Sequence, residues 1–223
     1  MSTGMSANPH PVTYFVTPQM TGRNRLTCFF RVFLAIPHVI LVGGPGLAIG
    51  FGSGIGSFSS DNGVWLGFGA GGVMGAVAYV MAIISWVIIV FSGKQPKGLW
   101  DFGVFYLRWR SRAVAYMALL RDEYPPFGDG AYAVQLGVGE FPEARNRWSV
   151  ALRLFYLIPH IIVLFFLGIA WAITALIGWI VILFTGAYPE GLYRFGIGYL
   201  RWSLRVEAYA LLLHDEFPPF SVD

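Results

Sequence analysis

Charged side chains are scarce in this sequence. Asp, Glu, Lys and Arg make up only 12% of its 223 residues, against about 25% in ordinary globular proteins. Between Arg31 and Lys94 the only such residue is Asp61, and between Arg153 and Glu190 there is none. Each interval exceeds the ~20 apolar residues that a helix needs to cross a bilayer. The scarcity of charge therefore predicts an integral membrane protein.

The sequence also has little that would support catalysis or nucleic-acid binding. Cys28 is its single cysteine, which excludes an internal disulfide. The net charge of +3 is small and scattered among apolar residues, so it suits anionic lipid head groups better than nucleic acid. We find no metal-ligand spacing, no phosphate-binding glycine motif and no activated nucleophile. No catalytic residue and no metal site is predicted.

What the sequence does contain is an internal repeat. Near the start of each copy, Ile36-Pro37-His38 recurs 122 residues later as Ile158-Pro159-His160. Near the end, Asp122-Glu123 recurs 93 residues later as Asp215-Glu216. The first copy therefore carries an insertion of 29 residues (122 minus 93) within its apolar interval. We divide the chain into an extended lead-in (1–13), a first membrane repeat (14–127), a linker (128–139) and a second membrane repeat (140–223).

The repeated segments resemble a known family. In the second copy they are Ile158-Pro159-His160, Phe184-Thr185-Gly186, Tyr188-Pro189-Glu190, Leu200-Arg201-Trp202 and Pro218-Pro219-Phe220. They are similar to a bacterial membrane family, the domains of unknown function numbered forty-three eighty-nine. The first copy departs from the pattern by its insertion and by Lys94-Gln95-Pro96-Lys97. The resemblance implies a bacterial inner-membrane protein in two tandem copies, and it implies no activity.

We expect each repeat to form a transmembrane hairpin. In the first copy, residues 28–50 and 64–91 are each long enough to cross, and a loop rich in glycine and serine separates them. In the second copy, residues 154–187 would make a helix of ~51 Å against a ~30 Å core, which predicts two short spans with a turn near Gly168. Hairpins leave all 15 Lys and Arg residues on the cytoplasmic side. The alternative is one crossing per repeat.

The segments after the hairpins, residues 99–121 and 192–214, are apolar but interrupted by charge. We interpret them as amphipathic helices in the cytoplasmic interface, the alternative being further tilted spans. The fold class is then all-α integral membrane: two repeated transmembrane helical hairpins, each followed by an amphipathic interfacial helix. The side chains expected at lipid head groups are Arg108, Arg112, Arg201, Arg205, Trp109 and Trp202.

Three further patterns support functional hypotheses. His38 and His160 each follow a proline and are candidate ligands for haem or a pigment. The alternative is that each bonds the carbonyl that its proline frees, Phe33 or Phe155, or an interfacial carboxylate. The acidic pairs before each Pro-Pro-Phe point apart on a helix, so we expect a solvated terminus or salt bridges to the Asn-Arg segments. Glycines at a four-residue spacing predict a ridge for a partner helix, the alternatives being packing against the protein's own helix or loop flexibility. These are Gly63, Gly67, Gly71 and Gly75.

The informative residues are therefore packing residues. They favour a non-catalytic accessory or scaffold subunit of a larger bacterial membrane assembly, respiratory or photosynthetic in kind. Its expected partners are anionic lipids and other membrane subunits, with no nucleic acid. The expected location is the inner membrane, multi-pass, with basic segments cytoplasmic. Two alternatives stay open: a small-molecule or lipid transporter, and a pigment- or haem-binding protein that uses His38 or His160.

Overall fold

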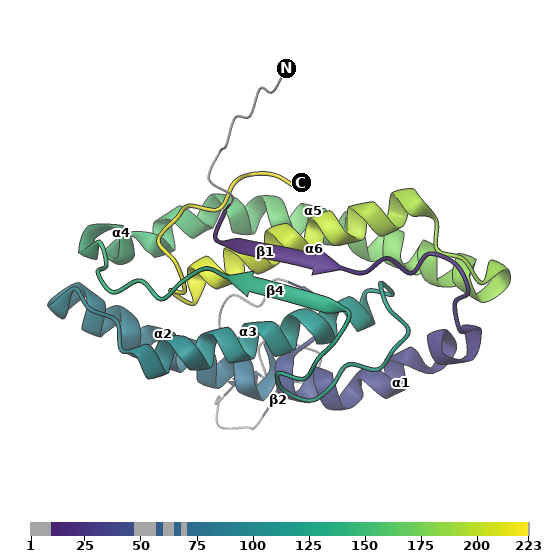
Figure 1. The fold of residues 1–223 in the computed structure, drawn as a ribbon, viewed down its shortest axis with the longest axis horizontal. Coiled ribbons are helices and arrows are strands. Elements are labelled where there is room, and N and C mark those ends of the chain that lie inside the picture. The colour runs from purple at the N-terminus through teal and green to yellow at the C-terminus, as the bar shows by residue number, and fades with distance from the viewer. Residues whose placement is uncertain (1–9, 47–56, 60–64, 68–70, 223) are drawn as a thin grey trace, which may run out of the picture.

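Apolar helices form a long double row along one face of the molecule (Figure 1). The computed structural model describes residues 10–46, 57–59, 65–67 and 71–222. Its elements are β1 (Val12–Val16), α1 (Arg25–Val42), β2 (Ser57–Ser59), β3 (Trp65–Gly67), α2 (Gly72–Ser92), α3 (Lys97–Met117), β4 (Val134–Val138), α4 (Arg147–Ala151), α5 (Arg153–Thr185) and α6 (Glu190–Ala210). The protein is thus mostly helical, as expected.

The second repeat contains one continuous helix where a hairpin was expected. α5 runs for 33 residues and passes through Gly168 without a turn. A Cβ at Gly168 would lie 3.0 Å from the hydroxyl of Tyr199. Glycine therefore allows α6 to pack closely against α5, and the predicted hairpin in this repeat is wrong.

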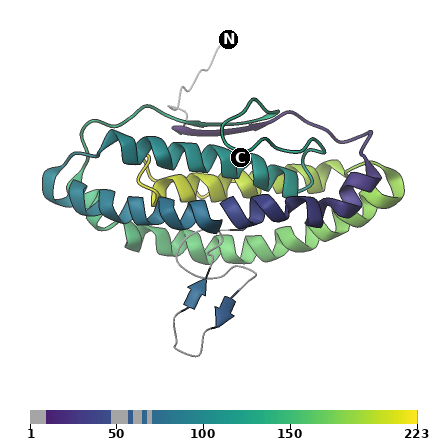
Figure 2. The same ribbon diagram turned by 90° about the horizontal axis from the view of Figure 1, so that it is seen from below.

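The first repeat forms the same long helix in two pieces. α1 ends at Val42 and α2 begins at Gly72, and the two lie end to end in both views (Figures 1 and 2). Gly72 has φ +64°, and a Cβ there would lie 2.6 Å from the Gly43 nitrogen, so the junction requires glycine. The insertion interrupts one helix and does not join the two legs of a hairpin. The short strands β2 and β3, which pair antiparallel, belong to it.

Helices α3 and α6 lie between the apolar row and a small sheet (Figure 2). They were expected at the membrane interface, but they supply much of the buried core, including Tyr106, Leu107, Tyr199 and Leu200. Their charged residues therefore belong to a middle layer inside the protein, and the position of these helices relative to a membrane interface stays a prediction. α3 packs against β4 and α6 packs against β1.

The sheet joins the two repeats by a symmetric contact. β1 pairs antiparallel with β4, with Tyr14 opposite Leu136 at the centre. The strands are themselves equivalent, because Val12 and Val134 are 122 residues apart. A pseudo-twofold axis therefore passes through the sheet, as at an isologous dimer interface. β1 begins in the expected lead-in (1–13), and β4 lies in the expected linker (128–139). Alternate side chains of both strands are buried, so both segments are part of the folded protein.

Candidate functional site

The most extensive candidate surface is the apolar face formed by α1, α2 and α5. All three helices are long and apolar enough to cross a membrane, and less than a third of each is buried. The largest exposed side chains include Phe29, Phe33, Ile40, Ile83, Phe91, Phe155, Phe165, Phe166, Ile173 and Phe184. Soluble monomers rarely expose contiguous apolar patches of more than a few hundred Å². This face is therefore consistent with a membrane protein.

Charged side chains lie on the other side of the middle layer. Arg112 donates to Asp129 at 2.7 Å and to the Gly128 carbonyl at 2.9 Å. Arg108 lies 3.6 Å from the same carboxylate, and Arg205 Nε lies 3.4 Å from the Val12 carbonyl. These arginines, predicted at lipid head groups together with Arg201, thus sit beside the sheet and its flanking loop. Whether they contact lipid stays a prediction.

Trp109 and Trp202 are buried, so their prediction as head-group contacts is wrong. Each indole N–H donates to the Nδ1 atom of a histidine at 3.2 Å, Trp109 to His38 and Trp202 to His160. The two tryptophans point from the middle layer into the apolar row. Their polar edge is satisfied inside the protein and does not need the membrane interface.

Both histidines are fully buried in aromatic surroundings. His38 Nε2 lies 3.2 Å from the Pro125 carbonyl, and its ring stacks on Phe127 at 4.6 Å. The ring of His160 stacks on Phe220 at 4.0 Å. Because Nδ1 accepts from tryptophan, the proton is assigned to Nε2. His38 thus bonds the Pro125 carbonyl and not the Phe33 carbonyl that was expected, and neither of its ring nitrogens is left for haem or a pigment in this arrangement.

A carboxylate holds two arginines at the end of the first repeat. Asp122 Oδ1 lies 2.7 Å from Arg23 Nη2 and 2.6 Å from Arg31 Nη2. Its Oδ2 accepts from the Asn24 N–H at 2.9 Å. Arg23 also donates to the carbonyl of Leu119 at 2.6 Å. The carboxylate therefore fastens the start of α1 to the turn after α3. A salt bridge to the Asn24-Arg25 segment was predicted, and its partners are Arg23 and Arg31 instead of Arg25.

The second repeat reproduces this clamp. Asp215 Oδ1 lies 2.8 Å from Arg145 and 2.6 Å from Arg153, and Arg145 donates to the Leu212 carbonyl at 2.8 Å. Leu212 and its counterpart Leu119 have φ of 62° and 64°, a conformation that costs a non-glycine residue about 1–2 kcal/mol. The arginines hold these turns closed, so the clamps are structural.

A buried ion pair at the centre of the molecule was missed by sequence reasoning. Arg110 Nε donates to Glu207 Oε2 at 2.9 Å, and the Tyr106 hydroxyl donates to Oε1 at 3.1 Å. Arg110 also donates to the carbonyls of Val42 at 2.6 Å and Gly46 at 2.8 Å. Burial raises the pKa of the Glu207 carboxyl, although Arg110 opposes this shift. The cluster lies where α1 ends and the insertion begins.

The repeat itself carried a signal for this cluster. At the spacing of 93 residues, Arg110 corresponds to Ser203, and Glu207 corresponds to Val114. A charge present in one copy and absent from the other indicates a position where the two copies differ in structure. Here the difference is the helix break, where Arg110 donates to backbone carbonyls that have no partner within the helix.

The expected glycine ridge does not form as one helical surface. Gly67 belongs to β3, Gly71 precedes α2, and only Gly75 lies inside that helix, while Gly63 lies outside the described residues. A Cβ at Gly71 or Gly75 would lie 2.5 or 2.7 Å from the Tyr106 hydroxyl. These two glycines make room for the protein's own α3. Within the described ranges, no three His, Cys, Asp or Glu residues are grouped to hold a metal.

Comparison with known families agrees with the repeated architecture. The model of a family described as a domain of unknown function (DUF4389) matches residues 66–128 and 147–221. The chain belongs to this family. The two matched segments are consistent with tandem copies, and the first begins beyond α1, near the end of the insertion. No curated protein matches the chain, and no solved structure does.

Proposed function

We propose that this protein is a non-catalytic scaffold subunit of a bacterial inner-membrane assembly. The observation that carries the proposal is the division of the molecule into an apolar face of α1, α2 and α5 and an opposite side with the sheet, where Arg108 and Arg112 pair with Asp129. The buried ionic groups are engaged in clamps and in a helix junction. Such an arrangement supports anchoring and presentation of a surface better than turnover of a substrate.

The position of the charges supports helices that lie in the membrane plane. Arg25 and Arg147 begin α1 and α4 at opposite ends of the long axis (Figure 1). If the long axis of the molecule crossed the bilayer, these two residues would lie at opposite leaflets. A molecule lying flat, with its pseudo-twofold axis along the membrane normal, keeps every basic segment at the cytoplasmic leaflet, in agreement with the positive-inside rule. We therefore prefer this orientation to the multi-pass crossing expected from the sequence.

Two further features favour the same orientation. The helix α5, with 33 residues, is about 50 Å long against a core of about 30 Å. Arg108 and Arg112 lie halfway along α3, so an upright molecule would carry them near the bilayer midplane, where an arginine costs at least about 3 kcal/mol. In the flat orientation they face the aqueous side.

The sheet face is the proposed docking surface for a partner subunit. Phe15 is 61% exposed on the outer face of β1, and Gln135 and Thr13 are exposed beside it. An exposed aromatic ring surrounded by polar groups is typical of an interaction site. The arginines of the middle layer surround this patch and would also meet anionic head groups.

Cysteine labelling tests the orientation. In a Cys28→Ala background, single cysteines replace Arg25, Arg147 and Arg108, and a membrane-impermeant maleimide is added to inside-out or right-side-out vesicles. A flat molecule labels at all three positions from the cytoplasmic side only. Labelling of Arg25→Cys and Arg147→Cys from opposite sides would overturn the orientation.

Gentle solubilisation of native membranes tests the scaffold role. We expect other membrane subunits to co-purify with the wild-type chain, and Phe15→Glu to release them while the protein stays in the membrane. Phe91→Leu, on the apolar face, serves as the matched control. A chain that purifies alone from native membranes would contradict the proposed role.

A further inference from the structure

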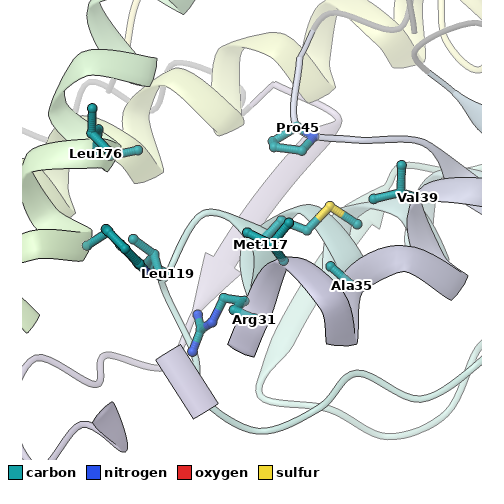
Figure 3. A pocket seen from close by; sticks show the side chains of 10 residues that line it. Arg31, Ala35, Val39, Pro45, Met117, Leu119 and Leu176 are labelled. Carbon is teal, nitrogen blue, oxygen red and sulfur yellow. The ribbon is translucent and has the colours of Figure 1, made fainter. Parts of the chain in front are cut away.

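A cavity of about 430 Å³ lies between α1, α5 and the end of α3 (Figure 3). Ala35 and Val39 of α1, Met117 of α3, and Leu176 and Trp179 of α5 form most of its wall. The volume falls within the range of small-molecule sites. The wall is almost wholly apolar, so a polar solute would lose its hydration there without compensation.

The cavity exists because α1 carries small residues where the second repeat carries larger ones. Ala35 corresponds to Leu157, and Val39 corresponds to Ile161. Leu157 is fully buried in the core of the second repeat. The fold therefore accepts a leucine at this position, and the first repeat leaves the space open.

The cavity opens on the apolar face. Val32 and Leu176 form part of its wall, and their exposed fractions are 72% and 58%. In the proposed flat orientation, both residues contact the acyl region of the cytoplasmic leaflet. The cavity is thus continuous with hydrocarbon, and a chain can enter it from the side.

Arg31 is the charged residue of this wall, and its guanidinium is already engaged within the protein. Its terminal nitrogens are bound to Asp122 at 2.6 Å and to the carbonyls of Tyr116 at 2.7 Å and Arg121 at 3.0 Å. The cavity therefore offers a ligand mainly apolar surface, which suits a hydrocarbon chain.

We propose that the cavity holds one acyl chain of a membrane phospholipid. The proposal rests on the membrane placement proposed above. It gives the asymmetric first repeat a lipid-binding role that the second repeat lacks.

Native mass spectrometry of the full chain tests the proposal. The protein is delipidated in detergent and then exchanged with vesicles of phosphatidylglycerol and phosphatidylethanolamine. We expect one tightly retained phospholipid per wild-type chain. The double variant Ala35→Leu/Val39→Ile, which copies the second repeat, should reduce its retention at least about tenfold. Val80→Leu, on the exposed part of α2, should retain the lipid like the wild type.

The reverse variant keeps the test decisive if the first does not fold. Leu157→Ala/Ile161→Val should open a matching cavity in the second repeat and add a second retained phospholipid. Equal lipid retention in the wild type and in the variant with the filled cavity would overturn the proposal, as would an isoprenoid quinone found in place of phospholipid on the chain before delipidation. Vesicle flotation separates the two hypotheses. A protein that floats with vesicles but retains no lipid contradicts only this inference, whereas one that does not float contradicts the membrane placement as well.

Discussion

The two repeats solve the same packing problem with different helices. In the second repeat, α5 crosses the whole apolar face in one piece; in the first, the insertion divides the equivalent helix into α1 and α2. A divided helix leaves backbone carbonyls without intrahelical partners at its new end. Arg110 binds the carbonyl of Val42 there, and Glu207 from the other repeat neutralises its charge. The helix end created by the insertion is therefore stabilised by a charge pair whose two residues come from distant segments of the chain.

What the repeats keep in common is equally instructive. Both retain the clamp of one aspartate with two arginines, and both bury a histidine against a tryptophan. These contacts hold each apolar row against its middle-layer helix. The largest differences are the helix break and the cavity beside it, and smaller ones affect the clamps and their neighbours. The following predictions test that contrast, from the largest expected effect to the smallest.

Removal of one partner of the central ion pair should have the largest effect. Glu207→Val leaves Arg110 charged and buried, which costs about 3–5 kcal/mol of stability for a broken buried pair. The double variant Arg110→Ser/Glu207→Val introduces the residues found at the equivalent positions of the other repeat, Ser203 and Val114. It should lose less stability than Glu207→Val. Equilibrium unfolding in mild detergent measures both. Equal losses in the two variants would contradict the role of the pair.

The aspartate clamps should differ in strength between the repeats. Asp122→Asn should destabilise by about 3 kcal/mol, because two buried arginines lose their counter-charge. Asp215→Asn should cost about half as much, because the Asp215 side chain is 30% exposed and that of Asp122 is 9% exposed, so that water already screens Asp215. Thermal unfolding of the two variants provides the measurement. A larger loss for Asp215→Asn would reverse the expected ranking.

His214 gives the second repeat a titratable group that the first repeat lacks at the equivalent position. Burial, with His10, Arg153 and Arg145 nearby, lowers the pKa of His214 to about 3, and its counterpart in the first repeat is Arg121. In the unfolded chain His214 binds a proton near pH 6.5, whereas in the folded protein it binds one only near pH 3. The free energy of unfolding is therefore highest above pH 6.5. Between pH 6.5 and 3 it falls by about 1.4 kcal/mol for each unit that the pH drops.

The variant His214→Gln isolates this effect. We expect the unfolding free energy of the wild type to decrease more steeply than that of the variant between pH 6.5 and 4.5. His10, whose pKa is also lowered by burial and whose ring contacts that of His214, is replaced by Gln in a second variant that measures its share of the pH dependence. Identical pH profiles for the wild type and His214→Gln would show that His214 does not cause the pH dependence of stability.

Deletion of residues 43–71 should have the smallest effect on stability. The deletion joins Val42 directly to Gly72. These residues correspond to Leu164 and Phe165, which are consecutive residues of the continuous helix α5. We expect the protein to fold with a change of about 1 kcal/mol or less, because an insertion of this kind mainly costs loop-closure entropy. In this background Arg110→Ser/Glu207→Val should be nearly neutral. A large loss on deletion would show that the insertion stabilises the fold.

Much of the architecture could be predicted because it depends on composition and periodicity. The repeat and the insertion are visible as two spacings, and the scarcity of charge identifies the apolar face. The pairing of Asp122 and Asp215 with arginines also follows from their recurrence beside segments that both copies share. In contrast, Val12–Val16 and Val134–Val138 are strands of only five residues each, and such short alternations are weak evidence without a pairing partner.

The sequence by itself determined that the chain is a duplicated, mostly apolar helical protein, and it left salt bridges of the aspartates as one of two alternatives. Tertiary structure alone decided whether the apolar runs turn back, and where the two tryptophans point. A helix satisfies its own backbone whether it is one piece or two, so residues 154–187 fit either form in isolation. Only packing against α6, where Gly168 meets Tyr199, selects the continuous helix. The Arg110–Glu207 pair likewise becomes visible only when two segments 97 residues apart meet in space.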